Sequence, residues 1–282
     1  EKEDTNLILE KAENIERNML LSDRVKKIFV TKSLAKNMIS KVNNYEIILN
    51  GHDFKLREFN STEELDKNLS KYIERILKQS LQDDFQTSLV MSGGSTPKGL
   101  FQLLSNTKLD WSNILVTLAD DRWVDVSHKD SNERLIKDLM LRNHAENAKF
   151  VSLKTACTSA SDGAMELECS FPKISSFSLV TLGMGADGHT ASLFPNTNSL
   201  QQGIDLNCSQ QFIASMPNDA PHMRISMTAS RLLAADEIII HIVGDKKREV
   251  LDKALAATDT SELPVRVILN QTRVPVTVFW SP

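Results

Sequence analysis

Asp187 and His189 lie two residues apart in a glycine-rich stretch, residues 183–195, which directly follows an apolar run over residues 177–182. In an α/β protein, such a turn carries reactive side chains at the carboxyl end of a parallel strand. A histidine of ordinary pKa, about 6.5, can accept a proton from water at neutral pH, and this contributes roughly 10²–10⁴ in rate. We therefore expect His189 to be a general base and Asp187 its polar neighbour. The alternative is that His189 only caps the following turn.

The same stretch contains the spacing Gly183-x-Gly185-x-x-Gly188, which is also that of a dinucleotide-binding turn. A dinucleotide site needs a helix of normal length after the third glycine and a second strand that ends in an acid some 20 residues on. Here Pro195 would interrupt such a helix seven residues after Gly188, and Asp205 follows no convincing strand. The glycines are therefore expected to present Asp187 and His189 rather than to bind a dinucleotide.

A second glycine-rich turn, with Gly93, Gly94, Ser95 and Thr96, follows the apolar residues 87–91 and precedes a helix that begins near Pro97. Glycines let backbone N–H groups approach a ligand, and the helix terminus adds unpaired donors and partial positive charge. These features predict a phosphate site, although no Gly-Lys-Ser/Thr sequence makes it a Walker loop. The alternative is a tight turn in which Ser95 or Thr96 only caps the helix.

Charged residues follow a third predicted strand, over residues 114–118. Asp121 and Arg122 are candidates to bind or polarise a substrate, and a surface ion pair is the alternative. A phosphate carries about two negative charges and needs further cations, for which Arg224 and Lys247 are candidates. Lys247 stands near the start of a predicted helix, where the helix dipole disfavours a cation, and this indicates a functional role. Either residue could equally be ordinary surface charge.

Strand and helix patterns alternate along most of the chain, which predicts an α/β fold with a Rossmann-like, mostly parallel sheet and helices on both faces. The predicted strands cover residues 46–49, 54–59, 87–91, 114–118, 150–153, 178–182, 212–215, 237–243 and 274–279. The predicted helices cover residues 61–81, 98–104, 132–141, 163–169, 229–234 and 246–256. Residues 5–29 show an amphipathic helical pattern, so we expect a helical amino-terminal extension over 1–45 and one α/β domain over 46–282.

The composition restricts the class of function. A net charge of −4 gives no support for binding to nucleic acid or to an anionic membrane, and no apolar run is long enough to cross a bilayer. The residues from Glu1 onward are charged, so no secretory signal is expected. Three widely spaced cysteines suggest neither a disulfide framework nor a zinc site. We expect a cytoplasmic enzyme with a small-molecule substrate, without a metal or cofactor; the sequence leaves monomer and homodimer open.

Four motifs, in order and at similar spacing, resemble those of the 6-phosphogluconolactonase family: Ser92-Gly-Gly-Ser-Thr-Pro-Lys98, Asp120-Asp-Arg-Trp-Val124, Asp130-Ser-Asn132 and residues 183–195. The resemblance runs from about Phe54 to Trp280. The related glucosamine-6-phosphate deaminases share the Asp-Gly-His core but continue with Ile-Ala-Phe-Asn-Glu-Pro, where this chain has Thr-Ala-Ser-Leu-Phe-Pro. They also tend to have Asp-Glu-Tyr at 120–122. Asp121 replaces a commoner glutamate, and Asn196 replaces a commoner glycine.

The resemblance implies hydrolysis of 6-phosphoglucono-1,5-lactone to 6-phosphogluconate in the pentose phosphate pathway, without a metal. On this hypothesis His189 activates water, Asp187 orients the water or substrate, and Arg122 stabilises the oxyanion. The phosphate would be held by Gly94, Ser95, Thr96, Arg224 and Lys247. Two alternatives remain: a deaminase-isomerase that releases ammonia from an amino sugar phosphate, and a sugar-phosphate sensor without turnover.

Overall fold

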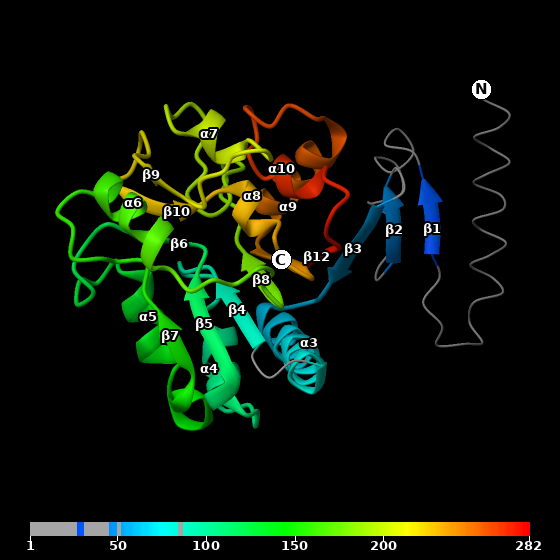
Figure 1. Cartoon of the computed structure of the whole chain (residues 1–282). Coiled ribbons are helices and arrows are strands. Elements are labelled where there is room, and N and C mark those ends of the chain that lie inside the picture. Colours follow the sequence, from blue (N-terminus) through cyan, green and yellow to red (C-terminus); the bar gives the residue numbers. More distant parts are fainter. Residues whose placement is uncertain (1–26, 31–44, 50–51, 84–86) are drawn as a thin grey trace, which may run out of the picture.

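The computed structural model describes residues 27–30, 45–49, 52–83 and 87–282 of the 282-residue chain, with side chains described from Phe54 onward. Within these residues, nine strands form one sheet in the order β1-β2-β3-β12-β11-β8-β4-β5-β7 (Figure 1). The strands are β1 (Lys27–Val30), β2 (Tyr45–Leu49), β3 (His52–Glu58), β4 (Thr87–Met91), β5 (Ile114–Leu118), β7 (Lys149–Val151), β8 (Leu179–Leu182), β11 (Ile238–Val243) and β12 (Val276–Ser281).

Neighbouring strands of this sheet run parallel, except for the antiparallel pair β2–β3. The central strands β4, β5 and β8 are buried along their whole length, because layers of the protein cover both faces. Strands of this kind read as continuous apolar runs, which is why the sequence predicts them well. The arrowheads of β4 and β5 point toward β6 and β10 (Figure 1), so the turns that follow these strands gather at one edge.

A second, three-stranded antiparallel sheet lies beyond this edge, in the order β6-β10-β9. Its strands are β6 (Asp120–Arg122), β10 (Arg224–Met227) and β9 (Phe212–Ser215). The sequence predicts a strand at 212–215 but places it in the parallel sheet, and it predicts neither β6 nor β10. Both missed strands are short and contain charged or polar residues, Asp120–Arg122 in β6 and Arg224 and Ser226 in β10. They therefore show no apolar periodicity from which a strand could be predicted.

The helices occur where the alternating pattern predicts them, and two short ones are additional. The α-helices are α3 (Thr62–Asp83), α4 (Lys98–Ser105), α5 (Asn132–Leu139), α6 (Ala160–Ser170), α7 (Leu200–Ile204), α8 (Ala229–Leu232), α9 (Asp245–Ala256) and α10 (Arg266–Leu269). Ser61 caps α3, because its hydroxyl accepts a bond from the Glu64 N–H. None of the helices within the described residues is long and apolar enough to cross a bilayer.

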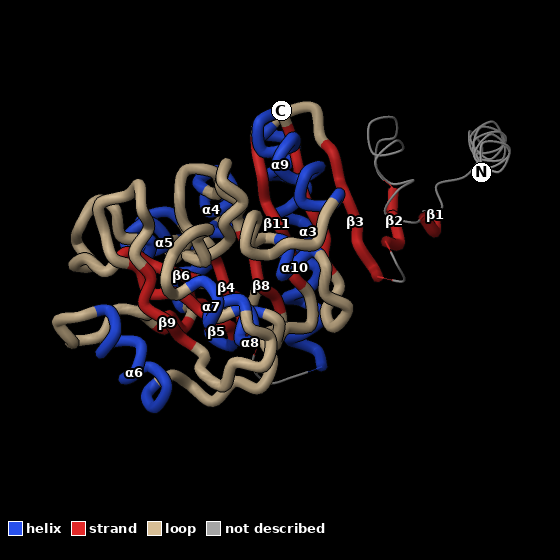
Figure 2. The backbone as a smooth tube through the Cα atoms, turned by 90° about the horizontal axis from the view of Figure 1, so that it is seen from above, coloured by secondary structure: helices blue, strands red, loops and turns tan. Residues whose placement is uncertain are grey.

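The amino-terminal expectation is partly wrong. Lys27–Val30 form strand β1, parallel to β2, where the periodicity predicts the end of a helix over 5–29. Residues 5–26 of that predicted helix lie outside the described residues, and the boundary at 45/46 stays a prediction. Strands β1, β2 and β3 form one end of the molecule, and β9 with α6 lies at the opposite end (Figure 2).

Candidate active site

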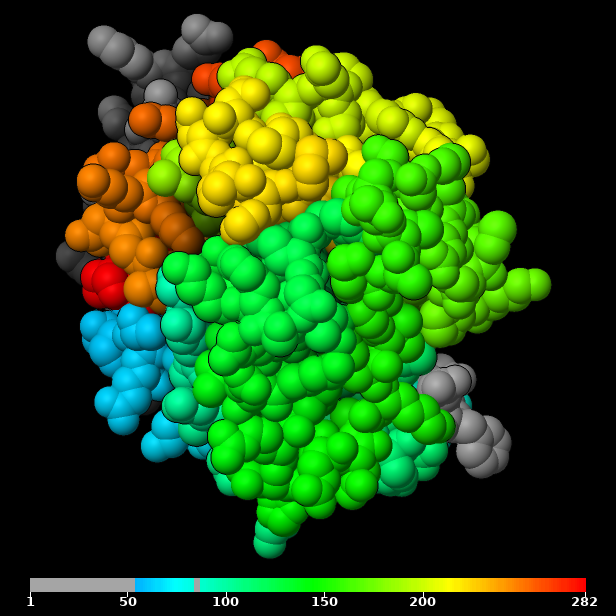
Figure 3. All heavy atoms as spheres, turned by 90° about the vertical axis from the view of Figure 1, so that its left-hand side faces the viewer, coloured from blue at the N-terminus to red at the C-terminus, as the bar shows by residue number. Residues whose placement is uncertain are grey.

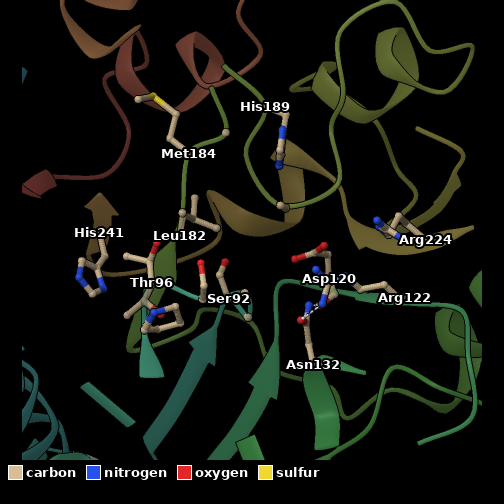
Figure 4. Close-up of a pocket in the computed structure, with 18 of the residues that line it drawn as sticks. Ser92, Thr96, Asp120, Arg122, Asn132, Leu182, Met184, His189, Arg224 and His241 are labelled. Carbon is tan, nitrogen blue, oxygen red and sulfur yellow. Dashed lines mark hydrogen bonds between the residues drawn. The ribbon is translucent and has the colours of Figure 1, made fainter. Parts of the chain in front are cut away.

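A cavity of about 340 Å³ lies at the carboxyl ends of β4, β8 and β11, beside the small antiparallel sheet (Figure 4). It brings together most of the residues that the sequence singles out, although they come from five separate segments. The predicted site residues that line it are Gly93, Gly94, Ser95, Thr96, Arg122, His189, Arg224 and Lys247. Two predicted residues, Asp121 and Asp187, do not line it.

The expected pair of His189 and Asp187 is present. His189 Nδ1 lies 2.5 Å from Asp187 Oδ1, and the same oxygen accepts the backbone N–H of His189 at 3.2 Å. Burial alone would raise the pKa of Asp187, but the hydrogen bond and charge of His189 lower it below its ordinary value. Asp187 is therefore an ionised acceptor that fixes the orientation of the ring. The ring points toward the centre of the cavity, across from Ser92 and Asp120 (Figure 4).

The glycines of this turn make room for that pair. A Cβ on Gly185 would lie 2.2 Å from His189 Nδ1 and 2.4 Å from Asp187 Oδ1, whereas a Cβ on Gly183 would meet nothing within 4 Å. Gly188 has a φ of +76°, which favours glycine. The ring of Phe194 supports the imidazole from one side, with a centroid distance of 4.4 Å. Gly185 and Gly188 thus serve the side-chain pair, whereas no steric contact requires a glycine at 183.

The second glycine turn forms another wall of the cavity. Gly94 has a φ of +92°, and a Cβ on Gly93 would overlap the Asn132 side chain, 2.0 Å from its Oδ1. Neither Ser95 nor Thr96 is the cap of the helix that follows, because the N-cap residue of α4 is Pro97 and this position makes no side-chain capping bond. The capping alternative is therefore wrong. The Ser92 hydroxyl, which the sequence does not single out, is buried at the cavity without a hydrogen-bond partner.

Arg122 lines the cavity as expected, but Asp121 does not. Arg122 Nη1 donates to the Asn132 side chain at 2.7 Å and to the Asp130 carbonyl at 2.9 Å, which fixes the guanidinium at the wall. Asp121 is only 2% exposed and points inward, where Oδ1 accepts the N–H groups of Arg122 and Asn132, and Oδ2 that of Glu133.

The placement of Asp121 among the substrate-binding residues is therefore a correction. Alternating side chains of β6 point to opposite sides, so Asp121 faces away when its neighbours face the cavity. Burial raises its pKa to about 6, against the effect of the three backbone N–H bonds. Asp121 anchors β6 to the start of α5, and Asp120 is the carboxylate that lines the cavity.

Arg224 stands directly opposite Arg122 in the antiparallel pairing of β6 with β10. Like charges opposite each other in a sheet are destabilising, and burial together with the charge of Arg122 lowers the pKa of Arg224. An anion between or beside the two guanidinium groups would relieve this repulsion. Lys247 lines the same cavity from α9, and burial lowers its pKa too.

Sequence reasoning missed one further titratable pair at the cavity. His241 on β11 is 4% exposed, lines the cavity, and has its Nε2 3.5 Å from Oδ1 of the buried Asp66 on α3. Burial lowers the pKa of His241 to about 3, with a smaller effect from Lys247, and burial raises that of Asp66 to about 6. The pair joins residues far apart in sequence, and the only local signal is a histidine inside an apolar strand.

Comparison with known proteins agrees with the extent of these motifs. The family model described as glucosamine-6-phosphate isomerases/6-phosphogluconolactonase matches residues 60–280. The 6-phosphogluconolactonase of Pseudomonas putida is 33% identical over 228 residues, which are 81% of this chain and 93% of that protein. The one from Rhizobium meliloti is 38% identical over 196 residues, 69% of this chain and 84% of that protein.

A solved structure shows the same likeness in three dimensions. The crystal structure of a 6-phosphogluconolactonase from Shewanella baltica OS155 is similar to this chain with a TM-score of 0.76 and 40% sequence identity. The match covers 80% of this chain and 97% of that one.

Proposed function

The chain belongs to the glucosamine-6-phosphate isomerase/6-phosphogluconolactonase family, and from this premise we propose that it hydrolyses 6-phosphoglucono-1,5-lactone to 6-phosphogluconate in the oxidative pentose phosphate pathway. The relatives that carry this name cover most of the chain. The observation that carries the proposal is the His189–Asp187 pair, 2.5 Å apart, whose imidazole faces the same cavity as Arg122 and the glycine turn.

In the first step, His189 removes a proton from water while the water oxygen bonds to the lactone carbonyl carbon. Its Nδ1 side stays directed to the Asp187 carboxylate, which stabilises the imidazolium as it forms. The negative charge that develops on the carbonyl oxygen is met by Arg122, whose Nη1 bonds to Asn132 and Asp130 hold the group in place before reaction. Removal of a single donor of this kind typically costs about 3–4 kcal/mol of transition-state stabilisation.

In the second step, the tetrahedral intermediate collapses and the bond between the carbonyl carbon and the ring oxygen breaks. His189 returns its proton to the ring oxygen, which becomes a hydroxyl group, and the carbonyl carbon becomes the carboxyl group of 6-phosphogluconate. No oxidant, reductant or metal is needed for this balance. One residue thus serves as base and then as acid, as an imidazole near neutral pH can.

The substrate phosphate is assigned to the glycine turn with Lys247 and Arg224. The support is chemical: Gly94 leaves the backbone of the turn open, Ser95 and Thr96 are not used as caps, and both cations line the cavity. Asp120 and Ser92 are added as groups for the sugar hydroxyls, because both line the cavity between the glycine turn and His189. Asp121 is assigned a positioning role.

The test is a lactonase assay with purified protein and freshly generated 6-phosphoglucono-1,5-lactone, measured against the spontaneous opening of the lactone. We expect a rate well above that background, and no ammonia from glucosamine 6-phosphate. Ammonia release would favour the deaminase chemistry. Tight binding of 6-phosphogluconate without turnover would favour a sensor.

The cysteines point to the compartment of the protein, and the cavity points to its partner. The three cysteines are free, with Cys157 and Cys208 half-buried and Cys169 exposed, which suits a reducing compartment such as the cytoplasm. The partner that the site supports is the sugar phosphate lactone itself. Size-exclusion chromatography with light scattering distinguishes a monomer from a homodimer.

A further inference from the structure

His128, Asp130 and His222 converge beside the cavity without lining it. His222 Nε2 lies 3.1 Å from Asp130 Oδ2, and His128 Nδ1 lies 3.8 Å from the same oxygen. One ligand atom from each residue lies within 4.8 Å of the other two, and the two imidazole rings meet edge to face with centroids 5.3 Å apart. All three residues are half-buried, so the cluster is fixed by its surroundings yet open to solvent.

These distances are close to those that a small divalent ion requires. Zinc binds imidazole nitrogen and carboxylate oxygen at about 2.0–2.2 Å, so two ligand atoms of a tetrahedral site lie roughly 3.3–3.5 Å apart. The two contacts of Asp130 Oδ2, at 3.1 and 3.8 Å, lie on either side of this value. A bound ion would take the His128 Nδ1 lone pair, which now accepts only a long bond of 3.2 Å from the Asp130 N–H.

The donor set selects the class of ion. Two imidazoles and one carboxylate suit zinc and its neighbours in the first transition row, whereas magnesium and calcium prefer oxygen ligands alone. Asp130 supplies the carboxylate of the set, in contact with both imidazoles. Three protein ligands leave a fourth position for water.

The same residues hold the two arginines of the cavity through their backbone carbonyls. Arg122 Nη1 donates to the Asp130 carbonyl at 2.9 Å, and Arg224 Nη1 donates to the His222 carbonyl at 2.9 Å. The two segments, around residues 128 and 222, meet on one face of the molecule (Figure 3), where the Trp123 N–H also donates to the Met223 carbonyl at 2.7 Å. An ion bound here would tie both segments together and so fix the positions of both guanidinium groups.

We propose that His128, Asp130 and His222 form a binding site for one divalent ion of the zinc class at the rim of the substrate cavity. The ion acts as a clamp between the loop after β6 and the loop before β10. The ion takes no part in proton transfer. Its binding can therefore be measured directly, and the result does not depend on whether the chain is a lactonase. Its effect on the reaction is indirect, through Arg122 and Arg224.

The experiment is titration calorimetry of zinc chloride into the full chain after treatment with a chelator. We expect saturable binding of one ion per chain, weakened at least 10- to 100-fold in Asp130→Asn and in His222→Ala, as is usual when a metal site loses a partner. His144→Ala removes an exposed histidine outside the cluster and is the matched control. His189→Ala is a second control, which distinguishes this site from the Asp187–His189 pair. Both His144→Ala and His189→Ala should bind zinc as the parent chain does.

A second readout protects the result against misfolded variants. Zinc that binds only the folded chain raises the thermal unfolding midpoint as its concentration rises. This increase should vanish in His128→Ala, which removes a ligand whose side chain is 39% exposed. Far-ultraviolet circular dichroism checks that each variant is folded. Unchanged binding in Asp130→Asn and His222→Ala, loss of binding in His189→Ala alone, or no saturable binding to the parent chain would each overturn the proposal.

Discussion

The Ser192 hydroxyl donates a 2.5 Å hydrogen bond to Asp120 Oδ2, across a separation of 72 residues in the chain. Both residues are buried. Ser192 belongs to the turn that carries His189, and Asp120 begins the strand that carries Arg122. The bond therefore sets the distance between the proposed general base and the proposed oxyanion donor, which no single motif fixes alone.

His189 is expected to dominate the rate. His189→Ala should lower kcat for the lactone by roughly 10²–10⁴, because water then loses its proton acceptor. Asp187→Asn should cost less, since the amide still accepts a hydrogen bond but stabilises an imidazolium poorly. Both rates are measured above the spontaneous opening of the lactone. A His189→Ala variant with the full lactonase rate would remove His189 from the mechanism.

Gly185→Ala should impair the site through geometry alone. Its Cβ would lie 2.2 Å from His189 Nδ1, so the ring must rotate away from Asp187, and kcat should fall by a factor of 10 or more, a loss of about 1.4 kcal/mol or more. Gly183→Ala is the matched change in the same turn, and its Cβ meets nothing within 4 Å. Urea unfolding should show a smaller loss of stability for Gly183→Ala than for Gly185→Ala; equal losses would contradict the steric explanation.

Asp121→Asn should destabilise the fold, although Asp121 does not touch the cavity. The amide nitrogen would face a backbone N–H that now donates to the carboxylate, which leaves a buried donor unpaired at a cost of about 1–3 kcal/mol. We expect a lower urea midpoint, and a lower kcat because Arg122 is carried by the same strand. A variant with parent stability and a selectively raised KM would instead return Asp121 to the substrate-binding residues.

Lys247 and Arg224 should favour the phosphorylated lactone over a lactone without a phosphate. Lys247→Gln and Arg224→Gln are each expected to raise KM for the phosphorylated lactone by roughly 10-fold or more, because a charge-assisted hydrogen bond contributes about 1.5–3 kcal/mol. The rate with unphosphorylated gluconolactone, which lacks the anion, should change little. A parallel loss with both substrates would assign the two cations to the reacting end of the lactone.

The buried residues Asp66 and His241 should each make the free energy of unfolding depend on pH, in opposite directions. The folded-state pKa of Asp66 is raised from 3.8 to about 6, so its contribution to the free energy of unfolding is full below pH 3.8 and is lost as pH rises to 6. That of His241 is lowered from 6.5 to about 3, so its contribution is full above pH 6.5 and is lost as pH falls toward 3. Between about pH 4 and 6 the two nearly offset each other.

Separating the pair should reveal each contribution. Urea unfolding of Asp66→Asn should show stability that rises with pH from about 4 to 6.5, because only the His241 effect remains. His241→Leu should show stability that falls with pH from about 4 to 6, on the order of 2–3 kcal/mol in total, because only the Asp66 effect remains. Parallel pH profiles for the two variants would contradict the opposite pKa shifts of Asp66 and His241.

The sequence alone determined the parts of this protein whose signals are local. Strands such as β4, β5 and β8 are buried on both faces and read as apolar runs, and the turns that follow them display Gly94, His189 and Asp187 in the sequence itself. The motifs also indicated the family, and the match over residues 60–280 confirmed it.

Only the tertiary structure decided which side chains meet. Asp120 and Asp121 are adjacent in sequence, yet one lines the cavity and the other is buried under β6, because pleating sends them to opposite sides. The small sheet that sets Arg122 opposite Arg224 joins segments a hundred residues apart, and Asp66 on helix α3 reaches His241 on strand β11. Such contacts depend on how the elements pack, and packing leaves no periodicity in the residues that it brings together.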